Sequence, residues 1–194
     1  TTSGRKVLMP FVTIANHRHD GVPFVETAAG VGVSGQFESE VFACYHKGDV
    51  LALVWDHGFP ADSNLIYSLP MRIGFPDGRA LRIKRDYTIS GVVDGNLPWP
   101  VFGEEDGVAT LSWFPLYFRQ RPRYPLRAAR FVAERFGVSD AYVLHAAHQY
   151  NFRTLLPPAF ELLQSPNPYA RSVGVGLRRH VELACGIDVP ARPA

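Results

Sequence analysis

The sequence predicts an α+β fold, with a β-rich first half followed by an α-helical C-terminal lobe. Short β-forming runs separated by glycines fill residues 6–45, and segments with helix-capping residues at their ends fill residues 125–186. Strand-type and helix-type segments grouped in this way are typical of an α+β arrangement. The chain has 194 residues, of which 46% are hydrophobic, so we expect one domain, or one domain and a lobe.

Strands are expected through most of the first half. Residues 6–13, KVLMPFVT, form a short apolar run that predicts a strand or an extended entry segment. Three further strands are predicted near residues 23–28, 30–34 and 40–45, where β-forming residues alternate with glycine clusters.

A helix is expected over residues 48–58, because Val50, Leu51, Val54 and Trp55 have the spacing of one helix face and Gly58 suits a C-terminal stop. Residues 66–103 are rich in glycine, proline and β-forming residues. The turn sequence Pro76-Asp77-Gly78 within them predicts a hairpin or loop region.

The second half is expected to be helical. Residues 111–120, LSWFPLYFRQ, read as a short helix broken by Pro115. A proline at its start and a glycine at its end mark a helix at 125–137. Ser139 is an N-cap residue for a helix at 139–152. Segments at 157–165 and 167–186 complete the helical part.

Composition limits the compartment and the partners. The net charge of +2 is too small to indicate a nucleic-acid partner, and no apolar run approaches the 18 residues of a membrane span. Cys44 and Cys185 are far apart in the sequence, and each stands among apolar residues. This pattern indicates buried free thiols in a reducing compartment. We therefore expect a cytoplasmic protein with no membrane partner.

Residues 30–35, GVGVSG, match the G-x-G-x-x-G pattern of dinucleotide-binding loops. That site needs a strand before the glycines and a helix after them, so that the helix N-terminus can hold the pyrophosphate. A strand-like segment, QFESEVFACY, follows here. Glycine-rich β-turns therefore account for the pattern better.

A metal site is the second local hypothesis. His17, His19 and Asp20 lie within four residues and could supply two imidazoles and a carboxylate to a metal. Further ligands would be needed, and His46, His57, His145 and His148 are available in the sequence. Scattered histidines are more often surface groups or hydrogen-bonded core groups, so both interpretations stay open.

Residues 119–135 contain six arginines against one acidic residue, with Tyr124 and Phe131 between them. Such a segment could bind an acidic ligand or RNA. The simpler interpretation is a solvated helix surface along which the arginine stems lie.

Three stretches, taken in order, resemble a known family. They are KVLMPFVTIANH, SEVFACYH and GDVLALVWDHGFPADSN, at residues 6–17, 39–46 and 48–64. This order resembles the second half of the SET domain in the Rubisco large-subunit methyltransferase family, and the helical second half is similar in kind to that family's substrate-binding helical domain. The resemblance implies the C-terminal part of a SET-like β domain at 1–65, an irregular or β connecting region at 66–107 and a helical substrate-binding lobe at 108–194.

The resemblance also implies site residues. Asn16 and His17 match the Asn-His pair that binds S-adenosylmethionine, Tyr45 matches the tyrosine of the methyl-transfer channel, and Phe59 matches the aromatic residue near the adenine. His57 stands where the family usually has a second catalytic tyrosine.

Physical chemistry is consistent with these roles. Methyl transfer from a sulfonium requires the enzyme chiefly to align and desolvate nucleophile and methyl group. A phenol such as that of Tyr45 could orient the amine, and a dry channel would help a substrate lysine to lose its proton.

The sequence departs from the family in three places. His57 replaces a tyrosine, and His46 replaces the small glycine after the first tyrosine. The family's Gly-x-Gly cofactor segment precedes the Asn-His strand by over a hundred residues, whereas fifteen residues stand there in this sequence. We expect a longer chain or a separate N-terminal chain to supply that segment, unless this is a shortened relative with a different function.

The resemblance thus implies a SET-type S-adenosylmethionine-dependent N-methyltransferase acting on a lysine or related amine of a protein or small molecule, or its C-terminal portion. Two alternatives are a non-catalytic SET-derived module that binds a protein partner and a small histidine-based enzyme with a metal site.

Overall fold

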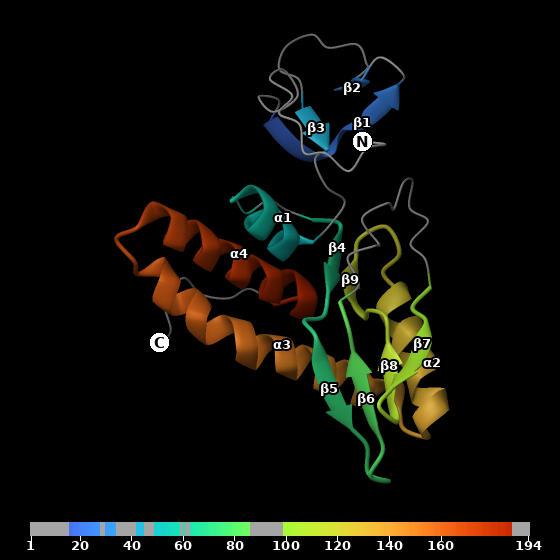
Figure 1. Ribbon diagram of the computed structural model, residues 1–194. Coiled ribbons are helices and arrows are strands. Elements are labelled where there is room, and N and C mark those ends of the chain that lie inside the picture. The colour runs from blue at the N-terminus through green and yellow to red at the C-terminus, as the bar shows by residue number, and fades with distance from the viewer. Residues whose placement is uncertain are drawn as a thin grey trace. The chain divides into compact units, whose positions relative to one another are not determined.

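The computed structural model describes residues 16–27, 30–33, 42–44, 49–58, 60, 63–85 and 99–187. The chain divides into two compact units, residues 1–47 and residues 48–194. Along the chain, strands in sheets precede the C-terminal helices, which confirms the predicted α+β class (Figure 1).

The first unit contains a three-stranded sheet in the order β2-β1-β3. Strand β1 (Asn16–Thr27) pairs antiparallel with β2 (Gly30–Val33) and parallel with β3 (Phe42–Cys44). The strands predicted near 23–28, 30–34 and 40–45 are thus confirmed. The segment predicted at 6–13 lies outside the described residues.

The second unit begins with helix α1 (Val50–His57). The Asp49 side chain caps it by accepting the Ala52 N–H at 3.0 Å, and Gly58 ends it with φ +76°. A residue without Cβ adopts this left-handed conformation at little cost. The helix predicted at 48–58 is confirmed.

A four-stranded sheet in the order β5-β6-β8-β7 follows. It consists of β5 (Met71–Gly74), β6 (Ala80–Ile83), β7 (Phe102–Glu105) and β8 (Val108–Leu111). Strands β6 and β8 run parallel, and the two outer pairs are antiparallel. The predicted turn joins β5 to β6, with Gly78 at φ +85° and the Asp77 carboxylate accepting the Arg79 N–H.

The short helix predicted at 111–120 is wrong. This segment contains the end of β8 and strand β9 (Pro115–Phe118), which pairs antiparallel with β4 (Leu65–Tyr67). Pro115 begins β9, a position where the missing N–H costs little. Pairing with β4 favours the strand over the helix, and it places Phe118 in one buried aromatic cluster with Leu65 and Tyr67.

Three helices complete the unit: α2 (Tyr124–Phe136), α3 (Asp140–Leu163) and α4 (Pro168–Cys185). The predicted helix with Ser139 as its N-cap is confirmed, and it extends through Pro157 and Pro158. The inner face of the sheet packs against these helices in the main core, and α1, α3 and α4 share a second core. The largest fully buried side chains of the main core include Phe114, Ile66, Leu81, Ile83 and Leu111.

Within the described ranges, no helix is both long enough and apolar enough to cross a membrane.

Candidate functional site

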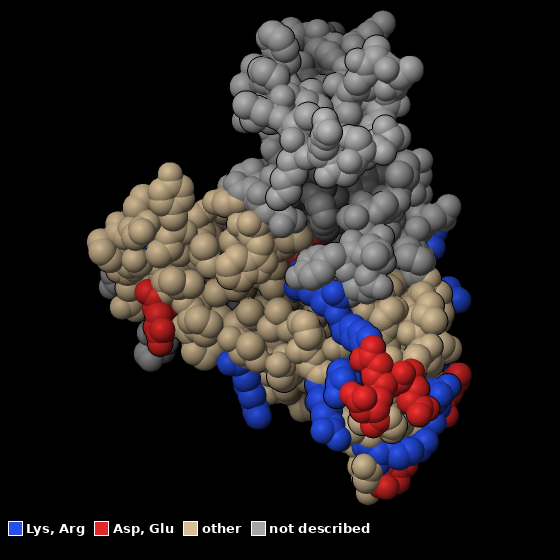
Figure 2. Space-filling view, in the orientation of Figure 1, with Lys and Arg blue, Asp and Glu red and all other residues tan. Residues whose placement is uncertain are grey.

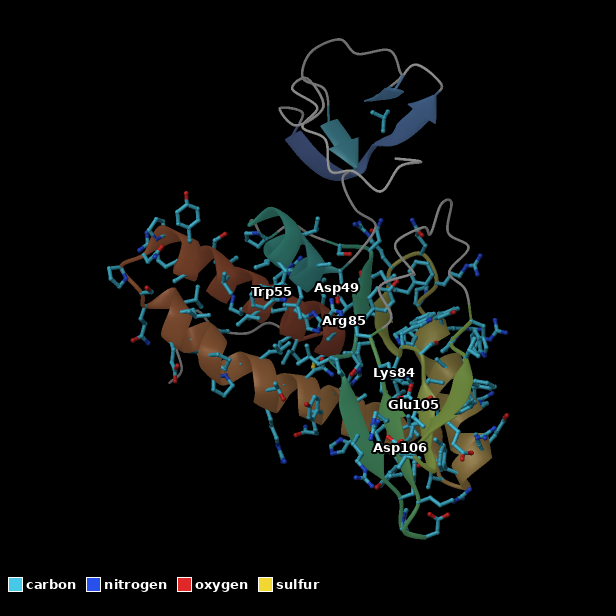
Figure 3. The ribbon with its side chains drawn as sticks, viewed as in Figure 1. Asp49, Trp55, Lys84, Arg85, Glu105 and Asp106 are labelled. Atoms are coloured by element: carbon cyan, nitrogen blue, oxygen red, sulfur yellow. The ribbon has the colours of Figure 1, made fainter. Side chains whose placement is uncertain are left out.

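A buried charged cluster lies at the start of α1. Asp49 is fully buried, and its carboxylate pairs with the Arg85 guanidinium, whose side chain is 7% exposed (Figure 3). The same carboxylate accepts the Ala52 N–H at 3.0 Å and the Tyr67 N–H at 3.2 Å. Asp49 therefore ties three segments together: the start of α1, strand β4 and the residues after β6.

His180 of α4 completes this cluster. It is fully buried, and its Nδ1 lies 3.7 Å from Oδ2 of Asp49. Neither ring nitrogen has a hydrogen-bond partner. Burial lowers the pKa of His180 to about 4, since the nearby Asp49 charge only partly offsets desolvation and Arg85 adds to the lowering. His180 is thus neutral at physiological pH.

Asp49 and His180 have no exposed surface, and the groove identified in the described part of the chain lies elsewhere. Burial and the Asp49 charge also raise the pKa of Tyr67. We therefore read Asp49, Arg85 and His180 as a structural cluster that fixes α1 and α4 against the strands.

An open groove of about 270 Å³ lies between strand β5 and helix α3. We call it the β5–α3 groove. Its lining residues come from one edge of β5 and from one face of α3: Met71, Arg72, Ile73, Gly74, Tyr142, Ala146, Gln149, Tyr150 and Arg153. Tyr142 and Tyr150 are 41% and 38% exposed, which is high for side chains of this size.

Strand β5 is an edge strand of the described sheet. Edge strands present unpaired main-chain groups, and proteins usually cover or charge them. The Tyr142 hydroxyl donates to the Gly74 carbonyl at 2.7 Å and so fixes α3 beside this edge. The groove therefore has a fixed wall on each side.

The groove's lining is basic. It contains Arg72 and Arg153 and no carboxylate. Figure 2 shows a group of acidic side chains that belongs to the turn from β7 to β8, where Glu105 lies beside Lys84 and 3.6 Å from Arg82. Shape and charge thus set the β5–α3 groove apart from its surroundings.

The predicted cofactor residues Asn16 and His17 begin strand β1, opposite Phe42 and Ala43 of β3. This pairing brings the Asn-His segment beside the strand that precedes Tyr45. Tyr45 itself and Phe59 lie outside the described residues, as does His46. His57 is the last residue of α1, in the other unit, and its side chain is not described.

The other sequence motifs have simpler structural explanations. The first four residues of GVGVSG form β2, antiparallel to β1, which agrees with the β interpretation of the glycines. The six arginines of residues 119–135 are all exposed, which agrees with the solvated surface, and the guanidinium groups of Arg127 and Arg135 lie over the Trp99 and Phe102 rings. His19 and Asp20 belong to β1, with side chains that are not described. In the described part of the chain, no group of three or more metal-ligand side chains gathers.

The sequence reasoning missed both the buried cluster and the groove. Asp49 directly precedes an apolar helical run, so its role as N-cap could have been read from the sequence. Arg85 and His180 carry no such signal, because a separation of 36 and 131 residues from Asp49 is closed only by the fold. The groove depends on which strand becomes the sheet edge, and local patterns do not specify this.

Comparison of the chain with models of protein families, with curated proteins and with solved structures gives no match. The geometry of the described residues is therefore the basis on which a function can be proposed.

Proposed function

We propose that residues 48–194 form a protein-binding module whose binding site is the β5–α3 groove. One observation supports this most directly: the edge strand β5, which carries Arg72, lies beside a face of α3 that exposes Tyr142, Tyr150 and Arg153. Tyrosine and arginine are enriched where proteins bind partners, because each offers a large contact area together with a polar end.

Selection from a phage-displayed library of random peptides tests this proposal on the full chain. We expect clones that bind the native chain and not the Gln149→Trp variant, because a bulky indole would fill the groove from α3. Thr154→Trp is the matched control, since Thr154 is an exposed residue of the same helix outside the groove lining. Circular dichroism verifies that both variants keep the fold.

A library that yields no binders would overturn the proposal. So would binders that recognise the Gln149→Trp variant as well as they recognise the native chain.

We propose S-adenosylmethionine-dependent N-methyl transfer as a second candidate function. The pairing of Asn16 and His17 with the strand that leads to Tyr45 supports it, because one cofactor groove lined by Asn16, His17 and Tyr45 needs these segments to be neighbours. Calorimetric titration of the native full-length protein with S-adenosylmethionine tests it. We expect binding, and with an amine substrate a loss of about a hundredfold or more in turnover for Tyr45→Phe. Absence of binding would remove this candidate and leave the binding module unaffected.

A further inference from the structure

We propose that the occupant of the β5–α3 groove is an extended acidic segment of a partner protein, which adds to β5 as a further strand. This inference rests on the proposed binding function and specifies the chemistry of the partner. It follows from the main-chain directions of β5, from the length of the groove and from its charge.

The ladder between β5 and β6 determines which main-chain groups face the groove. The Phe75 N–H donates to the Arg79 carbonyl at 2.9 Å, and the register then pairs Ile73 with Leu81 and Met71 with Ile83. In an antiparallel ladder, alternate residues bond to the partner strand and those between them point away. The N–H and C=O groups of Arg72 and Gly74 therefore point away from β6.

Tyr142 already occupies one of these outward groups, the Gly74 carbonyl. The main-chain N–H and C=O of Arg72 also point outward, at the centre of the strand edge. A strand added at this edge would form main-chain hydrogen bonds with these two groups, and such bonds give affinity that does not depend on the sequence of the added strand.

The length of the groove suits a short strand. On the β5 side, the four residues Met71–Gly74 line the groove. At about 3.3 Å per residue this is on the order of 10 to 13 Å, which about four extended residues of an added strand would span.

The charges of the groove favour an acidic occupant. Within the described part of the chain, neither Arg72 nor Arg153 forms an ion pair, whereas Arg79, Arg82, Arg85 and Arg130 each do. Arg72 lies directly opposite Arg82, and like charges facing each other across a ladder are unfavourable. Carboxylates beside Arg72 would relieve this repulsion, as Glu105 does for Arg82.

The same charges argue against a second copy of this chain as the occupant. Pairing of β5 with β5 would bring two Arg72 side chains onto adjacent strands with no carboxylate among the groove residues. A charged edge is a common means of preventing such association.

Side-chain directions predict the sequence pattern of the partner. In an added strand, alternate side chains would face the Ala146 and tyrosine surface of α3, and the others would lie on the outer face beside Arg72. We therefore expect acidic and small apolar residues in alternation.

A fluorescein-labelled peptide, Glu-Val-Glu-Val-Glu-Val, is a direct probe for the full chain, with binding followed by fluorescence anisotropy. We expect Arg72→Gln and Arg153→Gln each to weaken binding about fivefold. Arg130→Gln on α2 is the matched control and should leave binding unchanged. A Lys-Val peptide should not bind, and N-methylation of alternate amides should abolish binding by removing main-chain donors.

Equal binding to the native chain and to the Arg72→Gln and Arg153→Gln variants would overturn the inference. Library peptides that bind the groove but are basic, or that tolerate N-methylation, would also overturn it while the binding function stands. Concentration-dependent dimers in sedimentation that strengthen on Arg72→Gln would instead identify a second copy as the occupant.

Discussion

Asp49 connects more of the second unit than any local pattern around it indicates. It caps α1, accepts the Tyr67 N–H of β4, pairs with Arg85 and lies beside His180 of α4. A carboxylate without solvent contact must have its charge compensated, and here Arg85 and two main-chain donors do so.

Asp49→Asn should lower the free energy of unfolding by about 3 kcal/mol. The amide keeps an acceptor for the Ala52 N–H, so the cost comes mainly from the loss of the buried ion pair between Asp49 and Arg85. Urea titration measures the change, with Glu105→Gln as control. Glu105 is the acid of a surface pair with Lys84, and its substitution should lower the free energy of unfolding far less, because solvent screens an exposed pair. Equal effects of the two substitutions would contradict this explanation.

His180 should make the protein sensitive to acid. Its pKa is about 4 in the folded state against 6.5 for an ordinary histidine, so between these pH values the unfolded chain binds the additional proton. The effect of His180 on the free energy of unfolding is most favourable above pH 6.5. As the pH falls to about 4, the free energy of unfolding decreases by on the order of 3 kcal/mol.

The test compares urea unfolding of the native chain and of His180→Gln at pH 7, 6, 5 and about 4. We expect the stability of the native chain to fall more steeply than that of the variant over this range. Parallel pH profiles would contradict the assignment of the effect to His180.

At the scale of elements, α4 and α3 approach closely through Gly174. A Cβ at this position would lie 2.9 Å from the carbonyl oxygen of Ala159 and 2.9 Å from the main-chain nitrogen of Leu163. Both atoms belong to the main chain of α3, which cannot move aside as a side chain could. The separation of the two helices is therefore set by a residue without a side chain.

Gly174→Ala should lower the free energy of unfolding by about 1 to 3 kcal/mol, although alanine favours helix formation. Thermal unfolding measures the change. The neighbouring Val175→Ala is the matched control, since Val175 is exposed on the same helix, and it should change stability by less than about 0.5 kcal/mol. A Gly174→Ala protein as stable as the native chain would show that the helices can separate freely.

The continuous course of α3 also depends on packing between elements. Prolines within a helix cost about 3 kcal/mol or more, and α3 contains two, Pro157 and Pro158. Leu155 and Ala159 on either side of them are buried against Leu51 and Leu177 in the second core. This burial holds one helix together where the sequence indicated two segments.

At the scale of the whole molecule, each hydrophobic core described lies within residues 48–194. We therefore expect a chain that begins at Gly48 to fold by itself. Far-ultraviolet circular dichroism should show its helices, and its thermal transition should be cooperative. A fragment without a cooperative transition would contradict this expectation.

Local patterns predicted most of the elements. Asp49, Ser139 and Gly58 cap helices in ways that depend on neighbouring residues, and the Pro76-Asp77-Gly78 turn fixes its hairpin. The strand at 115–118 was missed because its partner, β4, lies about fifty residues earlier. The division into three parts and the SET-type function stay predictions.

The sequence by itself determined the α+β class, the ends of α1, α2 and α4, the start of α3 and the turn between β5 and β6, because caps and turns are decided by the conformational preferences of neighbouring residues. Only the tertiary structure decided that Asp49, Arg85 and His180 meet, and that β5 becomes a sheet edge beside α3. The cluster and the sheet edge both depend on contacts between residues far apart in the chain. Such contacts form only when whole helices and strands pack and pair with one another.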